Sequence, residues 1–352
     1  MDANWLREFA SIAGRAPSAD NSQPWVLHWN GHELEIRFAQ RDKSQSVFEA
    51  GSHATLLSVG AVLENLQATL AANGTRVDLQ WPANPALGEP YVLVSIAHAS
   101  EKFVAPEGPL QRHTNRGPFK RTPLPDAIVR EFGQRQEGAN RVAVLTGAQK
   151  SKLARLVRLC SEARFCNQRL HEWLIGSLRF TPNEVARGDG LDVEALCLPP
   201  GGKQFLRFTA DWRRLAALNR LGTYKLLALS EVALLSAAPA LLCVIGRADT
   251  RNAIDAGRFM SHTWADLNMK GIAVHPYYVV ADQINRLHDG TIARGFEAQL
   301  KTVEAELRQL LALAPDETLH MILRIGYPKV ITPVRSRRLP LDAILVDSTT
   351  SR

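Results

Sequence analysis

Two short segments of this 352-residue chain carry side chains that can bind an anion. Arg112, His113 and Thr114 place two groups able to be cationic and one hydroxyl in consecutive positions. The planar guanidinium of arginine binds phosphate through paired hydrogen bonds, so this triplet suits a phosphorylated ligand. Arg335 and Arg337 alternate along a tail that we expect to be extended, and both can therefore point to one side. The alternative is that these charges form a solvated turn and a basic edge.

The loop APSADNSQPW (16–25) offers a second set of polar groups. Ser18, Asn21 and Gln23 lie between Pro17 and Pro24, and the fixed φ of both prolines stiffens the loop. A stiff loop can hold an amide against a planar ring whose edge alternates donors and acceptors. Alternatively, Ser18 and Asn21 only cap the turn.

Four further residues could take part in the same chemistry. Arg116 follows Arg112 by four residues, and either faces a ligand or forms a surface salt bridge. Pro276, Tyr277 and Tyr278 follow a predicted helix at 252–270. The two tyrosines can shape a binding surface, or they can be aromatic residues packed in a buried strand.

Composition excludes several classes of protein. The formal charge is +7, a moderate positive balance that favours anionic ligands, and we find no basic helix of the kind that binds nucleic acid. Four cysteines lack metal-ligand spacing, so we predict no metal and a reduced, cytoplasmic protein. The longest apolar stretch (224–246) contains Lys225, Glu231 and Pro239, which predicts a buried helix and a core strand and no membrane partner.

Periodicity predicts a mixture of helices and strands. Helices are expected at 2–13, 53–72, 148–180, 252–270 and 294–313; a hairpin at 26–38; and a buried strand at 91–99. The segment 181–222 is rich in Gly, Pro and charge, and we expect it to be irregular. Two stretches, 60–74 and 257–271, share the same glycine-to-glycine spacing, and each comes shortly before a core strand. This match is either coincidence or the trace of a duplicated α+β lobe.

Three motifs together resemble one family. APSADNSQPW resembles the PS-x-x-N-x-QPW signature of FMN-dependent nitroreductases, and RHTNRGPF (112–119) resembles their R-[RH]-[ST]-x-[RK]-x-F run. The closing segment 325–345 is similar to the end of those enzymes. The likeness covers most of the chain except 181–222, and it is greatest to the Acg-like flavoproteins, in which one polypeptide resembles a nitroreductase dimer.

The resemblance implies a fold, a cofactor and a set of contacts. The fold is α+β, an antiparallel sheet sandwiched by helices, as two fused pseudo-repeated lobes at 1–110 and 111–352. The insertion at 181–222 has no counterpart in this family, and we expect it to form a lid because its apolar residues need a surface to cover. Arg112, His113, Thr114, Arg335 and Arg337 would meet the FMN phosphate, and Arg116 would lie near ring N1 and O2. The loop residues Pro17, Ser18, Asn21 and Gln23 would hold the ring edge. The backbone at Pro276, with Tyr277 and Tyr278, would face ring N5.

The order of the motifs departs from the family pattern. The PS-type loop lies in the first half and the RHTNR run opens the second, and each occurs once. In nitroreductase dimers each flavin takes the two motifs from different subunits, so an internal pseudodimer with one copy of each implies one FMN per chain.

Several functions follow from these expectations. The leading one is an FMN-dependent oxidoreductase that transfers hydride through flavin N5 between NAD(P)H and a small organic substrate. A biosynthetic dehydrogenase or oxidase is compatible too, and a flavin-storage protein with a closed lid is a rival. A degenerate scaffold is a more distant one. Either a monomer or a homodimer fits.

Overall fold

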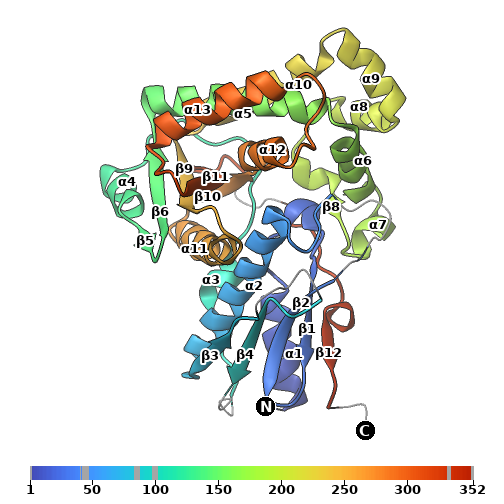
Figure 1. Cartoon of the computed structure of the whole chain (residues 1–352). Helices are drawn as coiled ribbons and strands as arrows, with labels where there is room; N and C mark the ends of the chain where they lie inside the picture. The colour runs from blue at the N-terminus through green and yellow to red at the C-terminus, as the bar shows by residue number, and fades with distance from the viewer. Residues whose placement is uncertain are drawn as a thin grey trace.

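The computed structural model describes residues 2–39, 41, 47–82, 88–96, 102–330 and 334–349. Within these residues the chain forms two lobes, each built on a five-stranded sheet (Figure 1). Helices α2 (His53–Ala72) and α11 (Thr250–Met269) pack against each other between the two sheets. The α+β class predicted from the sequence is therefore confirmed.

The first sheet has the strand order β12-β1-β2-β4-β3. Its strands are β1 (Trp25–Trp29), β2 (Glu33–Phe38), β3 (Val77–Gln80), β4 (Val92–Ile96) and β12 (Leu345–Asp347). β1 and β2 form the predicted hairpin, and its turn uses the positive φ of Gly31, 104°. Helices α1 (Ala3–Ala13) and α2 share one apolar core with these strands. Residues 97–99 of the strand expected at 91–99 lie outside the described residues.

The second sheet has the order β10-β11-β9-β6-β5, and all its neighbours are antiparallel. Its strands are β5 (Gln136–Glu137), β6 (Asn140–Leu145), β9 (Ala240–Arg247), β10 (Ala273–Tyr277) and β11 (Glu317–Gly326). Alternate side chains of β9 and β11 enter two different cores, so both faces are covered. One core holds α4 (Asp126–Gly133) and α11, and the other holds α5 (Gly147–Phe165), α10 (Thr223–Ala237), α12 (Val279–His288) and α13 (Glu297–Leu311).

The two lobes repeat one topology. The series β1-β2-α2-β3-β4 corresponds to β6-β9-α11-β10-β11, with the same neighbour order, the same strand directions and a 20-residue helix in the same place. The glycine match noted in the sequence therefore reflects two equivalent helices. Edge strands differ: β12 runs parallel to β1, whereas β5 forms a hairpin with β6.

Contacts between α2 and α11 are symmetric as well. A Cβ atom on Gly60 would lie 1.9 Å from the carbonyl oxygen of Ile254, and one on Gly257 would lie 2.2 Å from that of Leu57. Each glycine thus meets the residue three positions before its counterpart, as in a two-fold interface where contacts are reciprocal. Neither position can hold a side chain at this helix separation.

The prediction that 181–222 is irregular is wrong. This segment contains α7 (Pro182–Ala186), β8 (Leu191–Asp192), η3 (Val193–Leu196), α8 (Gly202–Thr209) and α9 (Trp212–Arg220). Short side-chain caps, such as the reciprocal Thr181–Glu184 pair of α7, start helices that are too brief to show a clear period. The segment follows α6 (Gln168–Ser177) and β7 (Leu178–Arg179), which pairs with β8.

A second correction concerns α10, which was expected to be a buried helix. Leu226 and Leu229 are 68% and 48% exposed, because α10 packs mainly against α5 and leaves its other side open. No helix in the described part of the chain is long and apolar enough to cross a membrane.

The boundary expected at residue 110 stays a prediction. The tail, which was assigned to the second lobe, returns to the first sheet as β12.

Candidate functional site

The loop at 17–24 has an unusual backbone. Asp20, Asn21 and Gln23 have φ values of 48°, 61° and 48°. Residues other than glycine rarely adopt this left-handed conformation, and such strain persists only where the surroundings enforce it. Here the hydroxyl of Ser18 accepts a hydrogen bond from the Gln23 N–H (3.0 Å), and Arg41 donates to the Gln23 carbonyl (2.9 Å). Three strained residues in one short loop indicate a functional constraint.

Amide side chains of this loop join it to two distant segments. The Asn21 amide donates to the carbonyls of Gly188 (3.2 Å), Gly190 (2.8 Å) and Arg337 (2.8 Å). Gln23 donates to Gly188 (2.8 Å) and accepts from the Leu339 N–H (3.0 Å). The loop therefore forms hydrogen bonds with both the insertion and the C-terminal segment, and we call this set of contacts the clasp.

Four arginines converge beside this clasp: Arg15, Arg112, Arg335 and Arg338. Arg112 and Arg338 both donate to the carbonyl of Arg15, at 2.6 and 3.1 Å. Arg15 and Arg335 both donate to the carbonyl of Leu110, at 3.0 and 3.4 Å. We call this group the arginine cluster.

The arginine cluster holds positive charge that the described residues do not neutralise. None of its members forms an ion pair with a described carboxylate. Burial lowers the pKa of Arg112 well below its ordinary value, and the other three arginines lower it further. Burial likewise lowers the pKa of Arg338 to about 10, with Arg15 and Arg116 adding to the effect. Because like charges are costly to gather without a counter-charge, this arrangement favours a bound anion.

Arg112 is the most enclosed member. It is 6% exposed, its guanidinium lies 4.7 Å above the Trp264 ring, and its Nε atom has no hydrogen-bond partner among the described residues. A buried donor without an acceptor is costly, so this atom marks where an acceptor of a ligand would bind.

The other predicted phosphate residues lie at the border of this cluster. The backbone N–H of His113 donates to the Asn268 side chain (2.8 Å), and its ring lies beside the carbonyl of Gln111. Burial lowers the pKa of His113, and Arg335 and Arg112 lower it further. Thr114 is half-buried, while Arg337 is exposed and contributes its carbonyl to the Asn21 clasp.

Arg116 extends the site toward the second sheet. Burial lowers its pKa, while Asp20, Cys197 and Tyr277 act in the opposite direction. Burial also raises the pKa of Asp20 against the opposing effects of Arg164 and Arg116, and the indole of Trp173 donates to its carboxylate (3.1 Å). The charges of Asp20 and Arg116 thus influence each other, and both groups are largely withdrawn from solvent.

Tyr277 and Tyr278 point to opposite faces of the second sheet. Tyr277 packs in the core with α5 and α12 and lies 4.5 Å from the His275 ring, centroid to centroid. Tyr278 packs on the α11 side, where its hydroxyl lies 2.9 Å from Nδ1 of His53. Of the two tyrosines, only Tyr277 influences the pKa of Arg116, and Pro276 lies half-buried before it.

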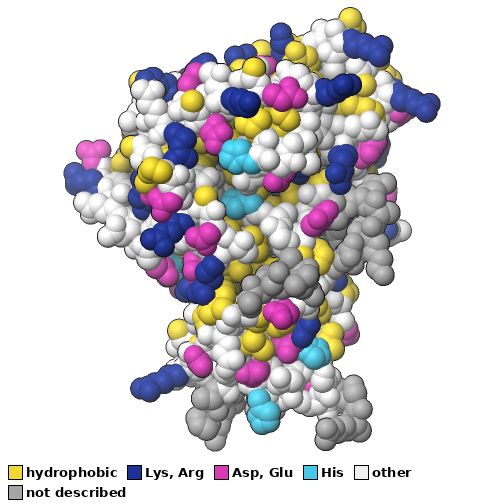
Figure 2. Space-filling model, in the orientation of Figure 1, with side chains coloured by type: hydrophobic (Ala, Val, Ile, Leu, Met, Phe, Trp, Pro, Cys, Tyr) yellow, Lys and Arg dark blue, Asp and Glu magenta, His cyan; other side chains and the backbone are white. Residues whose placement is uncertain are grey.

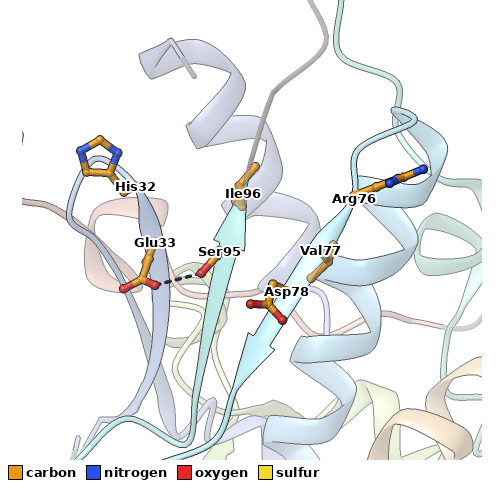
Figure 3. A pocket seen from close by; sticks show the side chains of 7 residues that line it. All are labelled: His32, Glu33, Arg76, Val77, Asp78, Ser95 and Ile96. Atoms are coloured by element: carbon orange, nitrogen blue, oxygen red, sulfur yellow. Dashed lines mark hydrogen bonds between the residues drawn. The ribbon is translucent and has the colours of Figure 1, made fainter.

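The hollow drawn in Figure 3 lies elsewhere, at strands β2, β3 and β4. Its volume is about 490 Å³, and it is lined by His32, Glu33, Arg76, Val77, Asp78, Ser95 and Ile96. No predicted site residue lines it. Among the described residues, no group of His, Cys, Asp or Glu could hold a metal ion.

Arg15 and Arg338 were not among the residues expected from the sequence. Arg15 directly precedes the strained loop and Arg338 follows Arg337, so both lay next to quoted motifs. Alternation along an extended tail selected Arg335 and Arg337. In the structure the Leu339 N–H donates to Gln23 and the Arg338 guanidinium donates to Asn21, so the Arg338 side chain reaches the site and the Arg337 side chain does not.

The chain matches curated proteins in sequence but matches no protein-family model. "Uncharacterized protein MT1398" of Mycobacterium tuberculosis (strain CDC 1551 / Oshkosh) is 26% identical over 312 residues, 86% of this chain and 43% of that protein. "Putative NAD(P)H nitroreductase acg" of the same strain is 27% identical over 173 residues, 47% of this chain and 51% of that protein. The chain thus spans about half the length of the curated relatives that it matches.

Solved structures give a weaker likeness. An FMN- and NADPH-dependent nitroreductase, NfnB from Sphigopyxis sp. strain HMH, shares 18% identity at a TM-score of 0.36, over 68% of this chain and 96% of that one. This overall similarity is too low to support residue correspondences. At the level of sequence, the chain is similar to the Acg-like, nitroreductase-type proteins, which is the resemblance that its motifs predicted.

Proposed function

We propose that this chain is an FMN-dependent oxidoreductase of the nitroreductase type. The observation that carries the proposal is the arginine cluster, because it gathers four guanidiniums without a described carboxylate beside the clasped loop. A phosphate dianion would neutralise this charge and accept hydrogen bonds from it. The named similarity to an NAD(P)H nitroreductase supports the choice of FMN over other phosphorylated ligands.

The residues present fit FMN at both ends of the site. Arg112, Arg338, Arg15 and Arg335 would hold the phosphate, and the unpartnered Nε of Arg112 would gain an acceptor. Arg116 would stabilise negative charge on the ring when it is reduced. Bound FMN would supply hydride transfer, for which the protein provides position and charge. NAD(P)H is the reductant that we propose, and an organic molecule is the acceptor.

We infer one FMN per chain. The connection before β6 is the counterpart of the loop before β1, and it is the tight β5-β6 hairpin instead of a strained loop. Glu137 of this hairpin lies 3.6 Å from Arg258, and its carboxylate would repel a phosphate there. The equivalent position in the other lobe therefore lacks the features that support binding.

The test of this proposal is FMN affinity in arginine variants. Arg112→Ala should weaken binding about ten- to a hundredfold, because the loss of a charge-assisted contact costs about 1.5–3 kcal/mol. Wild-type protein should bind one FMN per chain, measured by fluorescence titration with quantified flavin release. Arg121→Ala is the matched control, since Arg121 is exposed and lies outside the cluster.

Two results would contradict the proposal. Equal FMN affinity in Arg112→Ala and wild type would show that the phosphate does not bind at the arginine cluster. A ratio of two FMN per chain would contradict the single site. If FMN binds but neither NADH nor NADPH bleaches its absorbance, the oxidoreductase function fails while flavin binding stands. That outcome would favour storage, because Asn21 and Gln23 already hold the insertion against the loop.

A further inference from the structure

Exposed apolar side chains are concentrated on the surface formed by α8, α9 and the first half of α10. Ten large hydrophobic residues are exposed in the described chain, and four of them, Phe208, Leu221, Leu226 and Leu229, lie between positions 202 and 229. Leu221, at the turn between α9 and α10, is 85% exposed, Leu226 is 68% exposed and Phe208 is 51% exposed. Apolar side chains gathered in this way mark an interaction surface more often than chance exposure.

The same surface is strongly basic. Residues 201–229 contain six Lys and Arg against one Asp, a net of five positive charges, while the whole chain carries +7. Arg207, Arg213, Arg220 and Lys225 are exposed, and none forms an ion pair with a described residue. No basic helix was expected from the sequence, yet this one stretch of three helices carries a net of five positive charges.

The position of these helices suits contact with a broad, flat partner. In Figure 1, α8 and α9 form the outer corner of the second lobe, at the upper right. Figure 2 shows Lys and Arg side chains around this corner with hydrophobic side chains between them. Amphipathic helices with leucines or phenylalanines on one side and basic residues around them are typical of proteins that bind the interface of a lipid bilayer.

We propose that this face, defined by residues 202–229, binds an anionic lipid surface. Leu221, Leu226 and Phe208 would enter the boundary between headgroups and acyl chains, and the flanking arginines would contact anionic headgroups. A second copy of the chain is disfavoured, because a two-fold contact would oppose two surfaces of the same strong positive charge. The apolar stretch at 224–246 predicted no membrane partner because it cannot span a bilayer, but a peripheral contact needs no spanning helix. The proposal does not depend on FMN.

Vesicle flotation tests this proposal with the full chain. Wild-type protein should float with phosphatidylcholine vesicles that contain about one third phosphatidylglycerol, and not with phosphatidylcholine alone. Raising NaCl from about 0.1 to about 0.5 M should release it. The triple variant Arg207→Gln, Arg213→Gln, Arg220→Gln should bind about a hundredfold more weakly, since each basic side chain at the surface contributes about fivefold.

A second variant separates the apolar contribution from the charge. Leu221→Ser with Leu226→Ser should also weaken binding at least about tenfold, because each leucine loses the gain from burial. Both positions are exposed, so folding should be unchanged, which circular dichroism checks. Val104→Ser with Met269→Ser is the apolar control, and Arg121→Gln, Arg130→Gln, Lys152→Gln is the charge control.

Several flotation results would overturn the proposed binding to lipid. Equal flotation with neutral and anionic vesicles, or an arginine variant that binds as wild type does, would overturn electrostatic docking. No flotation at all would overturn lipid binding; dimerisation abolished by Leu226→Ser would then assign the face to a second copy. Retention on an acidic protein without flotation would likewise replace the lipid by a protein partner.

Discussion

At the scale of single residues, neighbours in the sequence take different roles in the site. Arg337 is exposed and presents its carbonyl to Asn21, whereas the guanidinium of Arg338 reaches the Asn21 side chain and the Arg15 carbonyl. Arg335 reaches Leu110 from an exposed position. The direction of each side chain, and not its spacing in the tail, decides which charge reaches the cluster.

This difference predicts unequal effects on flavin binding. Arg338→Ala should weaken FMN binding at least about tenfold, because it removes an enclosed charge that faces the other arginines. Arg337→Ala should change the affinity by less than about threefold, since its backbone contact remains. Isothermal titration of both variants measures this, and equal losses would show that the tail binds in a different register from the one described.

Sequence patterns predicted some parts of the site and not others, for reasons that lie in the fold. Arg112 and Asn21 stand in motifs that have local signatures. Arg15 and Arg338 are 323 positions apart, and only the return of β12 to the first sheet brings them together. Such contacts depend on topology, which local periodicity does not encode.

At the scale of elements, long helices were predictable and short ones were not. The expected helix at 53–72 coincides with α2, because a helix of twenty residues repeats its apolar spacing over several turns. Those in 181–222 have at most nine residues, so glycine, proline and charge dominated the interpretation of that segment. Burial of α10 was predicted from apolar content, which does not distinguish a core helix from one that exposes leucines.

The close packing of α2 and α11 predicts a sharp dependence on two glycines. Gly60→Ala and Gly257→Ala should each lower the free energy of unfolding by about 1–3 kcal/mol or more, because the new methyl group meets rigid backbone. Gly176→Ala is the control: this glycine lies in α6 with no heavy atom near an added Cβ, so alanine should raise stability. Urea unfolding followed by circular dichroism gives the values. Unchanged stability in Gly60→Ala would mean that the helices lie farther apart.

At the scale of the whole molecule, one chain reproduces the arrangement of a two-fold pair. Two lobes of equal topology meet through equivalent helices, and the arginine cluster combines Arg15 of the first lobe with Arg112 and the tail. A site of this kind exists only while the lobes stay together. Contacts across the α2–α11 interface therefore support both stability and ligand binding.

His262 provides one such contact, and its titration predicts how the cohesion of the lobes depends on pH. Its ring lies 3.0 Å from the carboxylate of Glu64 in α2 and 3.4 Å from that of Asp266 in its own helix. Hydrogen bonds to Asp266 and Glu64 raise the pKa of His262 from 6.5 to about 10. Because the folded pKa is the higher one, this stabilisation is fully present below pH 6.5 and is lost as the pH rises toward about 10.

The side chain of His262 is 57% exposed, so solvent screening should keep the contribution below about 1 kcal/mol. The measurement is the free energy of unfolding of wild type minus that of His262→Gln, followed by urea titration at a series of pH values. Groups that titrate alike in both proteins cancel in this difference. The difference between the two unfolding free energies should be constant and positive in mild acid and should decrease through the alkaline range. A difference that stays flat throughout would mean that the pKa of His262 is the same in the folded and the unfolded protein, and that its contacts with Glu64 and Asp266 add no pH-dependent stability.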